Sequence, residues 1–293
     1  MIHISEFGRI KSDFYCIGPP DVPVFLLDGK SPVIFEAGAS SLFPYYREKL
    51  QGILGSRTPS YLFLTHAHFD HCGSAGLLKK LYPDMAVCGS AAGAEIIKKP
   101  SALKLIAALN GDGGEDGSAF IPFEIERVLH DGELITAGDG LKIEIIATPG
   151  HTRDMLSYYI HGHRILIPSE SVGVPTRNGY IFSEFLVDYD LYVDSLKRLA
   201  GYEVDYLMLA HGAYLTGDEC RRYFSSAMAH TERFRDKIEG LLADYGDDID
   251  AVMGAVKKEE YDPVDGGKQP EEAYLLNLRA KVNAIKKRSS ILN

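Results

Sequence analysis

Short apolar runs bounded by turn residues recur along the first third of the chain. Three of them are rich in β-branched and aromatic side chains and predict strands: residues 22–28, 33–37 and 61–65. The sequence DGKSP at 28–32 predicts a hairpin turn between the first two strands. Residues 43–54 and 74–82 instead repeat apolar positions at helical spacing, so each of these segments is expected to form a helix.

The same order of strands and helices returns in the second part of the chain. A strand-rich stretch with glycine-containing turns runs from 126 to 168. It is followed by a predicted helix at about 189–200 and a predicted strand at 204–210. Two similar halves of this kind pack as α/β/β/α layers. The pattern therefore predicts an α/β protein with an αββα sandwich.

Two stretches depart from this order. Residues from about 91 to 117 are helical in pattern and end in the acidic, glycine-rich sequence GDGGEDG, which predicts an insertion on the surface. Residues 217–293 predict helices that are broken at 245–248 and at 262–270. We therefore expect a domain at 1–216 that carries the insertion, and a helical extension at 217–293. The extension is expected to pack on the core, because its apolar stripes need a partner surface.

Composition narrows the classes of function. Lys and Arg number 31 against 41 Asp and Glu, which gives a formal net charge of −10. A surface that binds nucleic acid needs clustered basic residues, so no nucleic-acid partner is expected. No apolar run reaches the roughly 18 residues of a membrane span, the N-terminal sequence lacks signal-peptide features, and the cysteines are scattered. We expect a cytoplasmic protein without a membrane partner, and we leave a homodimer open.

Candidate chemistry is concentrated directly after the strand predicted at 61–65. The sequence THAHFDH at 65–71 places three histidines and one aspartate within six residues. Alternate side chains of an extended segment point to the same side, so His66 and His68 can chelate one metal ion. Asp70 and His71, on the following turn, can then serve a second ion. Imidazole and carboxylate ligands of this kind suit Zn, Fe or Mn.

Further ligand-type side chains stand where other predicted strands end. His151 follows the strand at 141–147 and His211 follows the strand at 204–209, and each has a glycine beside it. Glycine lets the backbone turn sharply there, so both imidazoles can face a shared cavity. Glu170 similarly ends a predicted strand in the sequence LIPSE. Recurrence at several strand ends indicates one site rather than scattered surface histidines.

These positions, in this order, resemble the metallo-β-lactamase superfamily over roughly residues 10–215. The HxHxDH signature is complete. The resemblance implies an αββα sandwich with two divalent metal ions, Zn or Fe with Mn as a further candidate, at one edge of the two sheets. It also implies a ligand set: His66, His68 and His151 for the first ion, Asp70, His71 and His211 for the second, and Glu170 in the place of the bridging carboxylate.

The chain departs from the family pattern at that bridging position. The family usually has Asp there, commonly after Gly, whereas this chain has Ser169 and Glu170. A glutamate has one more methylene, and it can still bridge, bind one ion only or turn away. Glu36, in the sequence IFEAG, similarly stands where many members have the Asp of an Asp-x-Gly sequence.

The resemblance implies a hydrolase that acts on a small acyl substrate, a thioester, ester or lactone, by means of a metal-bridging hydroxide. Asp70 would orient this nucleophile and carry a proton to the leaving group. Residues 22–27, 36–38 and 65–73 and the helical tail are similar to thioesterase-like members such as the quinolone signal response protein, which implies an iron-containing site. Alternatives are a phosphodiesterase or nuclease with the same ligands, and a regulatory binding protein that retains the metal site. A flavodiiron protein is disfavoured, because it would carry Glu at the place of His68.

Overall fold

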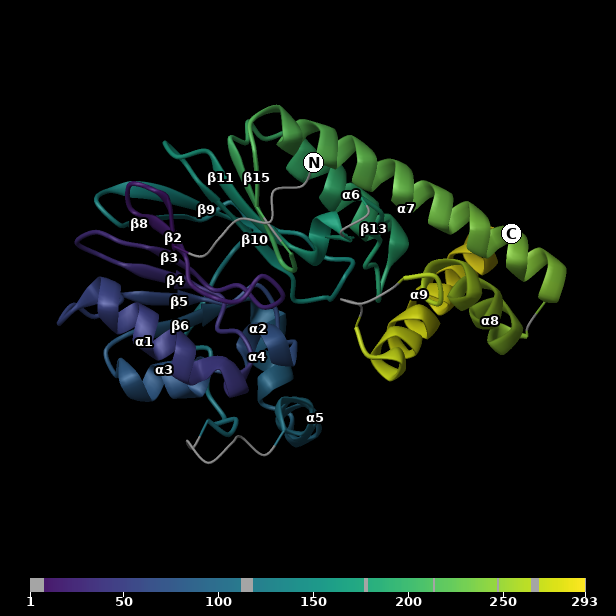
Figure 1. Cartoon of the computed structure of the whole chain (residues 1–293). Coiled ribbons are helices and arrows are strands. Elements are labelled where there is room, and N and C mark those ends of the chain that lie inside the picture. Colours follow the sequence, from purple (N-terminus) through teal and green to yellow (C-terminus); the bar gives the residue numbers. More distant parts are fainter. Residues whose placement is uncertain are drawn as a thin grey trace. The chain divides into compact units, whose positions relative to one another are not determined.

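The computed structural model describes residues 8–111, 118–176, 179–212, 214–246, 248–264 and 269–292 (Figure 1). The chain divides into two compact units that each combine segments distant in sequence. Unit 1 consists of Met1–Ala147, Asp154–Ser169 and Glu203–Cys220, and unit 2 of Thr148–Arg153, Glu170–Tyr202 and Arg221–Asn293. The units interleave along the chain, so the domain boundary expected after residue 216 stays a prediction.

A seven-stranded sheet forms the first half of unit 1. Its strands follow one another in chain order: β1 (Gly8–Lys11), β2 (Phe14–Cys16), β3 (Phe25–Leu27), β4 (Val33–Phe35), β5 (Tyr61–Phe63), β6 (Ala86–Gly89) and β7 (Arg127–Val128). Strands β3 and β4 pair antiparallel with Phe25 opposite Phe35, which confirms the predicted hairpin. From β4 to β7 the neighbouring strands are parallel.

A six-stranded sheet, in the order β15-β14-β11-β10-β9-β8, forms the second half of unit 1. Its strands are β8 (Leu134–Ala137), β9 (Leu141–Ala147), β10 (Leu156–Ile160), β11 (Ile165–Ser169), β14 (Tyr206–Leu209) and β15 (Tyr214–Thr216). Strands β11 and β14 are parallel, and the other neighbours are antiparallel. The strand-rich stretch predicted at 126–168 and the later strand at 204–210 are both confirmed.

Alternation along the strands builds two apolar layers within unit 1. Ile34 and Leu62 face a core that they share with helices α1 (Phe43–Leu54) and α3 (Ala75–Leu81). Figure 1 shows these two helices along one face of the first sheet. Phe35 and Phe63 point the other way and pack with Tyr158 of β10 in the core between the sheets. A one-residue register shift would exchange these faces, so burial on both sides fixes the register.

The predicted insertion contributes two helices to unit 1, α4 (Ala91–Ile97) and α5 (Pro100–Asn110). The glycine-rich loop predicted at the end of this segment is not described by the structure from residue 112 to residue 117. Ile97 and Ile106 are buried in the core that Ile34 and Leu62 share with α1 and α3, whereas Leu105 and Leu109 are exposed. The insertion is therefore helical as predicted, and one of its faces is anchored in unit 1.

Unit 2 is mainly helical. It contains η2 (Glu170–Val172), the short pair β12 (Val174–Pro175) and β13 (Ile181–Phe182), α6 (Tyr189–Ala200), most of α7 (Asp218–Tyr245), α8 (Ile249–Glu260) and α9 (Glu271–Leu292). The helices predicted for 217–293 are confirmed, although residues 247, 265–268 and 293 lie outside the described part. Phe185 and Tyr192 pack with Phe234, Val256 and Leu278 in one apolar core. In the described ranges no helix is both long and apolar enough to cross a membrane.

Candidate metal centre

The HxHxDH sequence lies at the end of a buried strand. Strand β5 ends at Phe63 and the short helix α2 spans Phe69–Cys72, so His66 and His68 lie on the connecting loop. The ring centroids of His66 and His68 are 4.4 Å apart, and those of His66 and His71 are 4.3 Å apart. His66 and His71 are both buried. A rigid strand followed by one turn of helix thus gathers three imidazoles in a small volume.

His211 reaches the same place from the second sheet of unit 1. It follows β14, and its ring centroid is 5.5 Å from that of His71. Oδ2 of Asp70 lies 3.7 Å from Nε2 of His211 and 3.8 Å from Nε2 of His71. Two ligands of a tetrahedral Zn²⁺ ion, with bonds of about 2.0–2.2 Å, are separated by about 3.3–3.6 Å. The three side chains predicted for the second ion are therefore brought together at a spacing only slightly wider than that of ligands on one divalent ion.

Glu36 fixes the imidazoles of His66 and His71. Its Oε1 accepts from the Thr65 hydroxyl at 2.5 Å and from Nδ1 of His71 at 3.2 Å. Thr65 has one hydroxyl proton, and its shortest contact is to Glu36, so its oxygen accepts from Nδ1 of His66 at 3.0 Å. Protonation at Nδ1 leaves the lone pair of each ring on Nε2, which is the form that binds a metal ion.

The backbone at Glu36 is strained to make this possible. Glu36 has φ of 67°, in the left-handed region, at a typical cost of about 1–3 kcal/mol for a residue other than glycine. Its N–H donates to the Phe63 carbonyl at 2.9 Å, and the next residue, Ala37, donates to the His71 carbonyl at 2.8 Å. These bonds tie the turn after β4 to β5 and α2, so the strained turn places the carboxylate beneath the histidines.

A backbone carbonyl orients His211 in the same way. Nδ1 of His211 lies 2.5 Å from the carbonyl oxygen of Asp21, and a carbonyl can only accept. The proton is therefore on Nδ1, and Nε2 is directed toward Asp70. The N–H of Gly212 also donates, at 2.6 Å, to the Pro20 carbonyl. The loop that carries His211 is thus held against the segment at residues 20–21.

The two remaining predicted ligands, His151 and Glu170, belong to unit 2. Nδ1 of His151 donates to the Glu184 carbonyl at 2.6 Å, so its lone pair is also on Nε2. Glu170 is buried, and its carbonyl accepts from the Tyr192 hydroxyl at 3.2 Å. Ser169, just before it, has φ of 49°, a conformation that favours glycine. That the metal ions are shared between these two residues and the ligands of unit 1 stays a prediction.

Two positioning side chains escaped the sequence analysis. Oδ2 of Asp154 accepts from the N–H of Ala67 at 2.9 Å and holds the residue between His66 and His68. Asn110, the last residue of α5, is buried and donates to the Phe69 carbonyl at 3.3 Å, at the start of α2. Neither residue belongs to a recognisable motif, and both act over a long sequence separation. No local signal could have identified them.

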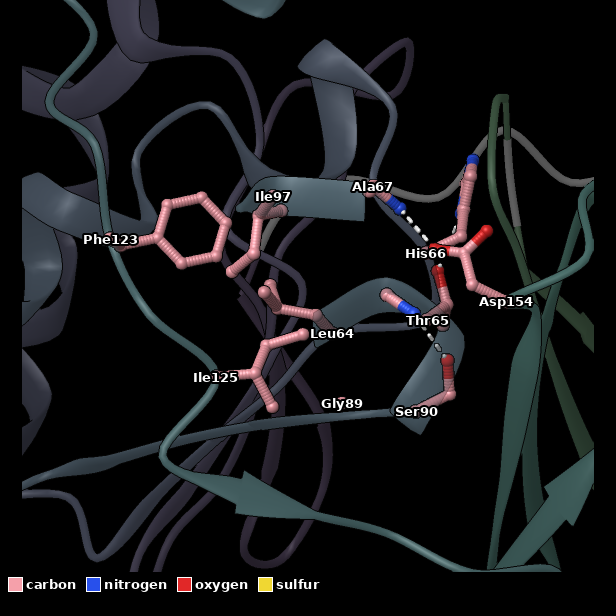
Figure 2. A pocket seen from close by; sticks show the side chains of 11 residues that line it. Leu64, Thr65, His66, Ala67, Gly89, Ser90, Ile97, Phe123, Ile125 and Asp154 are labelled. Carbon is pink, nitrogen blue, oxygen red and sulfur yellow. Dashed lines mark hydrogen bonds between the residues drawn. The ribbon is translucent and has the colours of Figure 1, made fainter. Parts of the chain in front are cut away.

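A pocket in unit 1 adjoins the histidine-bearing loop (Figure 2). Its apolar wall is made by Leu64, Ile97, Phe123 and Ile125, and polar atoms come from Thr65, His66, Ser90 and Asp154. Figure 2 shows His66 and Asp154 together at one side and the apolar side chains at the other. Neither Lys nor Arg is among the lining residues. The lining thus combines apolar side chains with His66 and with Thr65 and Asp154, which hold the loop that carries His66 and His68.

Cys72, which directly follows the HxHxDH sequence, is a core residue. It is fully buried among the apolar side chains on the helix side of the first sheet. Burial raises the pKa of its thiol well above the usual value, and the nearby carboxylates of Asp70 and Asp154 act in the same direction. A thiol with a raised pKa is neutral at pH 7 and a poor nucleophile. Its place in the core accounts for it without a chemical role.

Relatives of known sequence match parts of the chain. The chain is 35% identical over 109 residues to glyoxylase B2 of Dictyostelium discoideum, covering 37% of this chain and 34% of that protein. It is 33% identical over 103 residues to hydroxyacylglutathione hydrolase of Erwinia tasmaniensis, covering 35% of this chain and 30% of that protein. The chain therefore spans about a third of the length of these curated relatives.

Structural and family comparisons cover more of the chain. The archaeal metallo-β-lactamase superfamily protein ST1585 from Sulfolobus tokodaii superposes with a TM-score of 0.60 and 18% identity, over 97% of this chain and all of that one (100%). This likeness confirms the predicted fold, including its C-terminal helical region. The sequence profile of the Metallo-beta-lactamase superfamily matches residues 17–211, a segment that contains each of the seven predicted ligands. The chain therefore belongs to the metallo-β-lactamase superfamily.

Proposed function

We propose that this protein is a metal-dependent hydrolase of a small acyl substrate, a thioester, ester or lactone. The observation that carries the proposal is the cluster of Asp70, His71 and His211, whose ligand atoms lie within 4.8 Å of one another. Hydrogen bonds at Nδ1 hold both histidines with their lone pairs on Nε2. Side chains arranged in this way are prepared to bind a cation, and a purely structural polar cluster would not need this common orientation.

The proposed centre holds two divalent ions, Zn or Fe with Mn as a further candidate. The first would be bound by His66, His68 and His151 and the second by Asp70, His71 and His211, with Glu170 between them. When bound, such a pair supplies a nucleophile from water at neutral pH and a Lewis acid for the substrate oxygen. The match of the superfamily profile over residues 17–211 supports this ligand order.

Asp70 is the residue that we assign to proton handling. About a fifth of its side chain (20%) is exposed, so it is more accessible than His71, at 4%. It can therefore orient an attacking water molecule and hold the proton that the water loses. A thiolate leaving group needs little help from an acid, because a thiol has a pKa of about 8.5, whereas an alcohol is a far weaker acid. One partly exposed carboxylate is thus well matched to a thioester.

Two further observations favour an acyl substrate. The side chains beside His66 form a small, largely apolar pocket that has neither Lys nor Arg in its lining, so this part of unit 1 offers no basic group to a phosphodiester. One relative is named as a hydrolase of hydroxyacylglutathione, which is an acyl thioester. The similarity to the quinolone signal response protein stays a prediction, and so does an iron-containing site.

The proposal is tested with the purified protein, elemental analysis and three substrates: an acyl-CoA thioester, a homoserine lactone and bis-nitrophenyl phosphate. We expect bound metal and turnover of an acyl substrate, both strongly reduced by His66→Ala and Asp70→Ala. The matched control is His161→Ala, because His161 is exposed and pairs with Glu144 outside the cluster. Turnover of the phosphodiester alone would favour a phosphodiesterase, and bound metal without any turnover would favour a regulatory binding protein.

A further inference from the structure

A lysine is buried in the helical core of unit 2. Lys281, on α9, is only 1% exposed, and its Nζ lies 3.5 Å from Oε1 of Glu184. The rings of Phe182 and Phe234 lie beside the ammonium, with centroids at 6.0 and 5.3 Å. Lysine is almost never fully buried unless it is paired, because desolvation of its charge is costly. The Lys281–Glu184 ion pair therefore joins α9 to the segment that carries Glu184.

The partner of Lys281 also orients a predicted metal ligand. The carbonyl of Glu184 accepts from Nδ1 of His151 at 2.6 Å. The N–H of Glu184 donates to the Tyr192 hydroxyl at 3.5 Å, and that hydroxyl donates to the Glu170 carbonyl at 3.2 Å. The side chain of Glu184 thus pairs with α9, and its backbone contacts His151 directly and the Glu170 segment through Tyr192. These contacts all lie within unit 2.

We propose that Lys281 is a positioning residue for the metal centre, which acts through Glu184 on the imidazole of His151. If the ammonium is removed, the Glu184 carboxylate is left buried without its countercharge, which is strongly unfavourable. The segment around Glu184 then shifts to bring the carboxylate to water, and its carbonyl moves with it. His151 loses the hydrogen bond that sets its tautomer and orientation. The C-terminal helix α9 is on this basis a part of the metal-binding apparatus.

The inference rests on the proposed function only in that His151 is taken as a ligand. Groups that orient a metal-binding histidine typically contribute roughly 10- to 100-fold to metal affinity. A merely structural lysine would lower the melting temperature and leave metal affinity intact. Metal affinity of the folded protein is therefore the quantity that separates the two roles.

The chain offers a matched control on the same helix. Arg288 of α9 bonds Asp190 of α6 at 2.9 Å and Glu239 of α7 at 3.2 Å, and it lies over the ring of Tyr189. It thus connects α9 to α6 and α7, and the structure records no contact between it and Glu184. Arg288→Met should destabilise unit 2 without disturbing His151.

The experiment measures Zn²⁺ affinity of the full chain by competition with a chelating dye, and the visible spectrum after loading with Co²⁺. Lys281→Met should weaken Zn²⁺ binding roughly 10- to 100-fold and change the Co²⁺ spectrum. Lys281→Arg, which keeps the charge, should recover most of the affinity, and Arg288→Met should retain it. Wild-type affinity and spectrum in folded Lys281→Met would overturn the inference.

Two further variants keep the test decisive. If Lys281→Met does not fold, the double variant Lys281→Met, Glu184→Met replaces the buried ion pair with apolar side chains, a change that is often tolerated. The double variant has no buried carboxylate to drive the shift, and the backbone carbonyl at position 184 is kept. It should therefore bind Zn²⁺ with nearly wild-type affinity, and strongly weakened binding in this folded variant would overturn the inference. His151→Ala should lower affinity at least as much as Lys281→Met. A wild-type protein that binds no metal would refute the proposed function itself, whereas a metal-binding wild type with a normal Lys281→Met variant refutes only this inference.

Discussion

The Thr65 hydroxyl and Oε1 of Glu36 are joined by a hydrogen bond of 2.5 Å, in a part of unit 1 where both residues are buried. The same carboxylate oxygen accepts from Nδ1 of His71, and Thr65 in turn accepts from Nδ1 of His66. One buried carboxylate therefore determines which ring nitrogen is available on two predicted ligands. Bonds to a charged acceptor are stronger than bonds between neutral groups.

Glu36→Gln should consequently weaken metal binding without large changes in shape. The amide keeps one accepting oxygen but carries no charge, and its NH₂ group faces donors. We expect Zn²⁺ affinity to fall roughly 10- to 100-fold, as is usual when a partner of a metal-binding histidine is altered. Chelator competition measures this effect, with Glu144→Gln as the control, since Glu144 pairs with the exposed His161. Equal Zn²⁺ affinity in Glu36→Gln and wild type would show that Glu36 does not orient the histidines.

Asn110 should link the helical insertion to the metal centre. Its side chain accepts from the Ser40 N–H at 2.7 Å and donates to the carbonyls of Phe69 at 3.3 Å and Ile106 at 2.9 Å. Asn110→Ala leaves these buried groups without their partner, at a typical cost of about 1–3 kcal/mol for each group that stays unsatisfied. We expect a lower melting temperature and, because α2 carries Asp70 and His71, a lower metal affinity.

A second substitution separates the accepting role of the Asn110 side chain from its donating role. Asn110→Asp keeps the acceptor for Ser40 and loses the donor to Phe69, so metal affinity should fall in this variant as well. Ser101→Ala, on the exposed side of α5, serves as the control for the helix. Loss of stability with unchanged metal affinity in both Asn110 variants would limit the residue to a structural role.

The fold was largely predictable because the buried side chains of a helix or strand recur in the sequence with the period of that element. Strands β3, β4 and β5 and helices α1, α6 and α7 fall within the predicted segments, since each buries a regular set of apolar side chains. Strand β6, which is only four residues long, was missed. Its sequence AVCG offers too few positions for a period to be recognised, and its identity as a strand depends on pairing with β5 and β7.

The candidate site was predictable only where its residues stand in a motif. His66, His68, Asp70 and His71 are adjacent in sequence, and His151 and His211 follow strand ends beside glycines. Asp154 and Asn110 support the site through contacts across 87 and 41 residues, and only the folded chain brings these pairs together. Lys281 belongs to a helix whose sequence looks like any charged helix, so its burial follows from tertiary packing alone.

The four cysteines should be unreactive in the folded protein. Burial raises the pKa of the thiols of Cys16 and Cys220 to about 11 and that of Cys88 to about 12, and it raises that of Cys72 well above its usual value. Because the thiolate is the reacting form, the raised pKa makes each thiol less reactive at pH 7.5, and reactivity rises as the pH approaches these values. Mass spectrometry after iodoacetamide treatment should show little labelling of native protein and complete labelling after denaturation. Rapid native labelling of Cys72 would contradict its assignment to the core.

We predict that Glu170 determines how many metal ions the chain binds. Its carboxylate is buried in unit 2, and Ser169 adopts the left-handed conformation that turns the chain after β11. If the longer side chain bridges, Glu170→Gln should reduce the metal content from two ions to one, because a neutral amide stabilises a pair of cations poorly. Elemental analysis of the wild type and the variant gives the ratio of metal to protein. Glu239→Gln is the control, since Glu239 is a carboxylate of unit 2 that pairs with Arg288. One ion in the wild type, or two ions in Glu170→Gln, would show that Glu170 does not bridge.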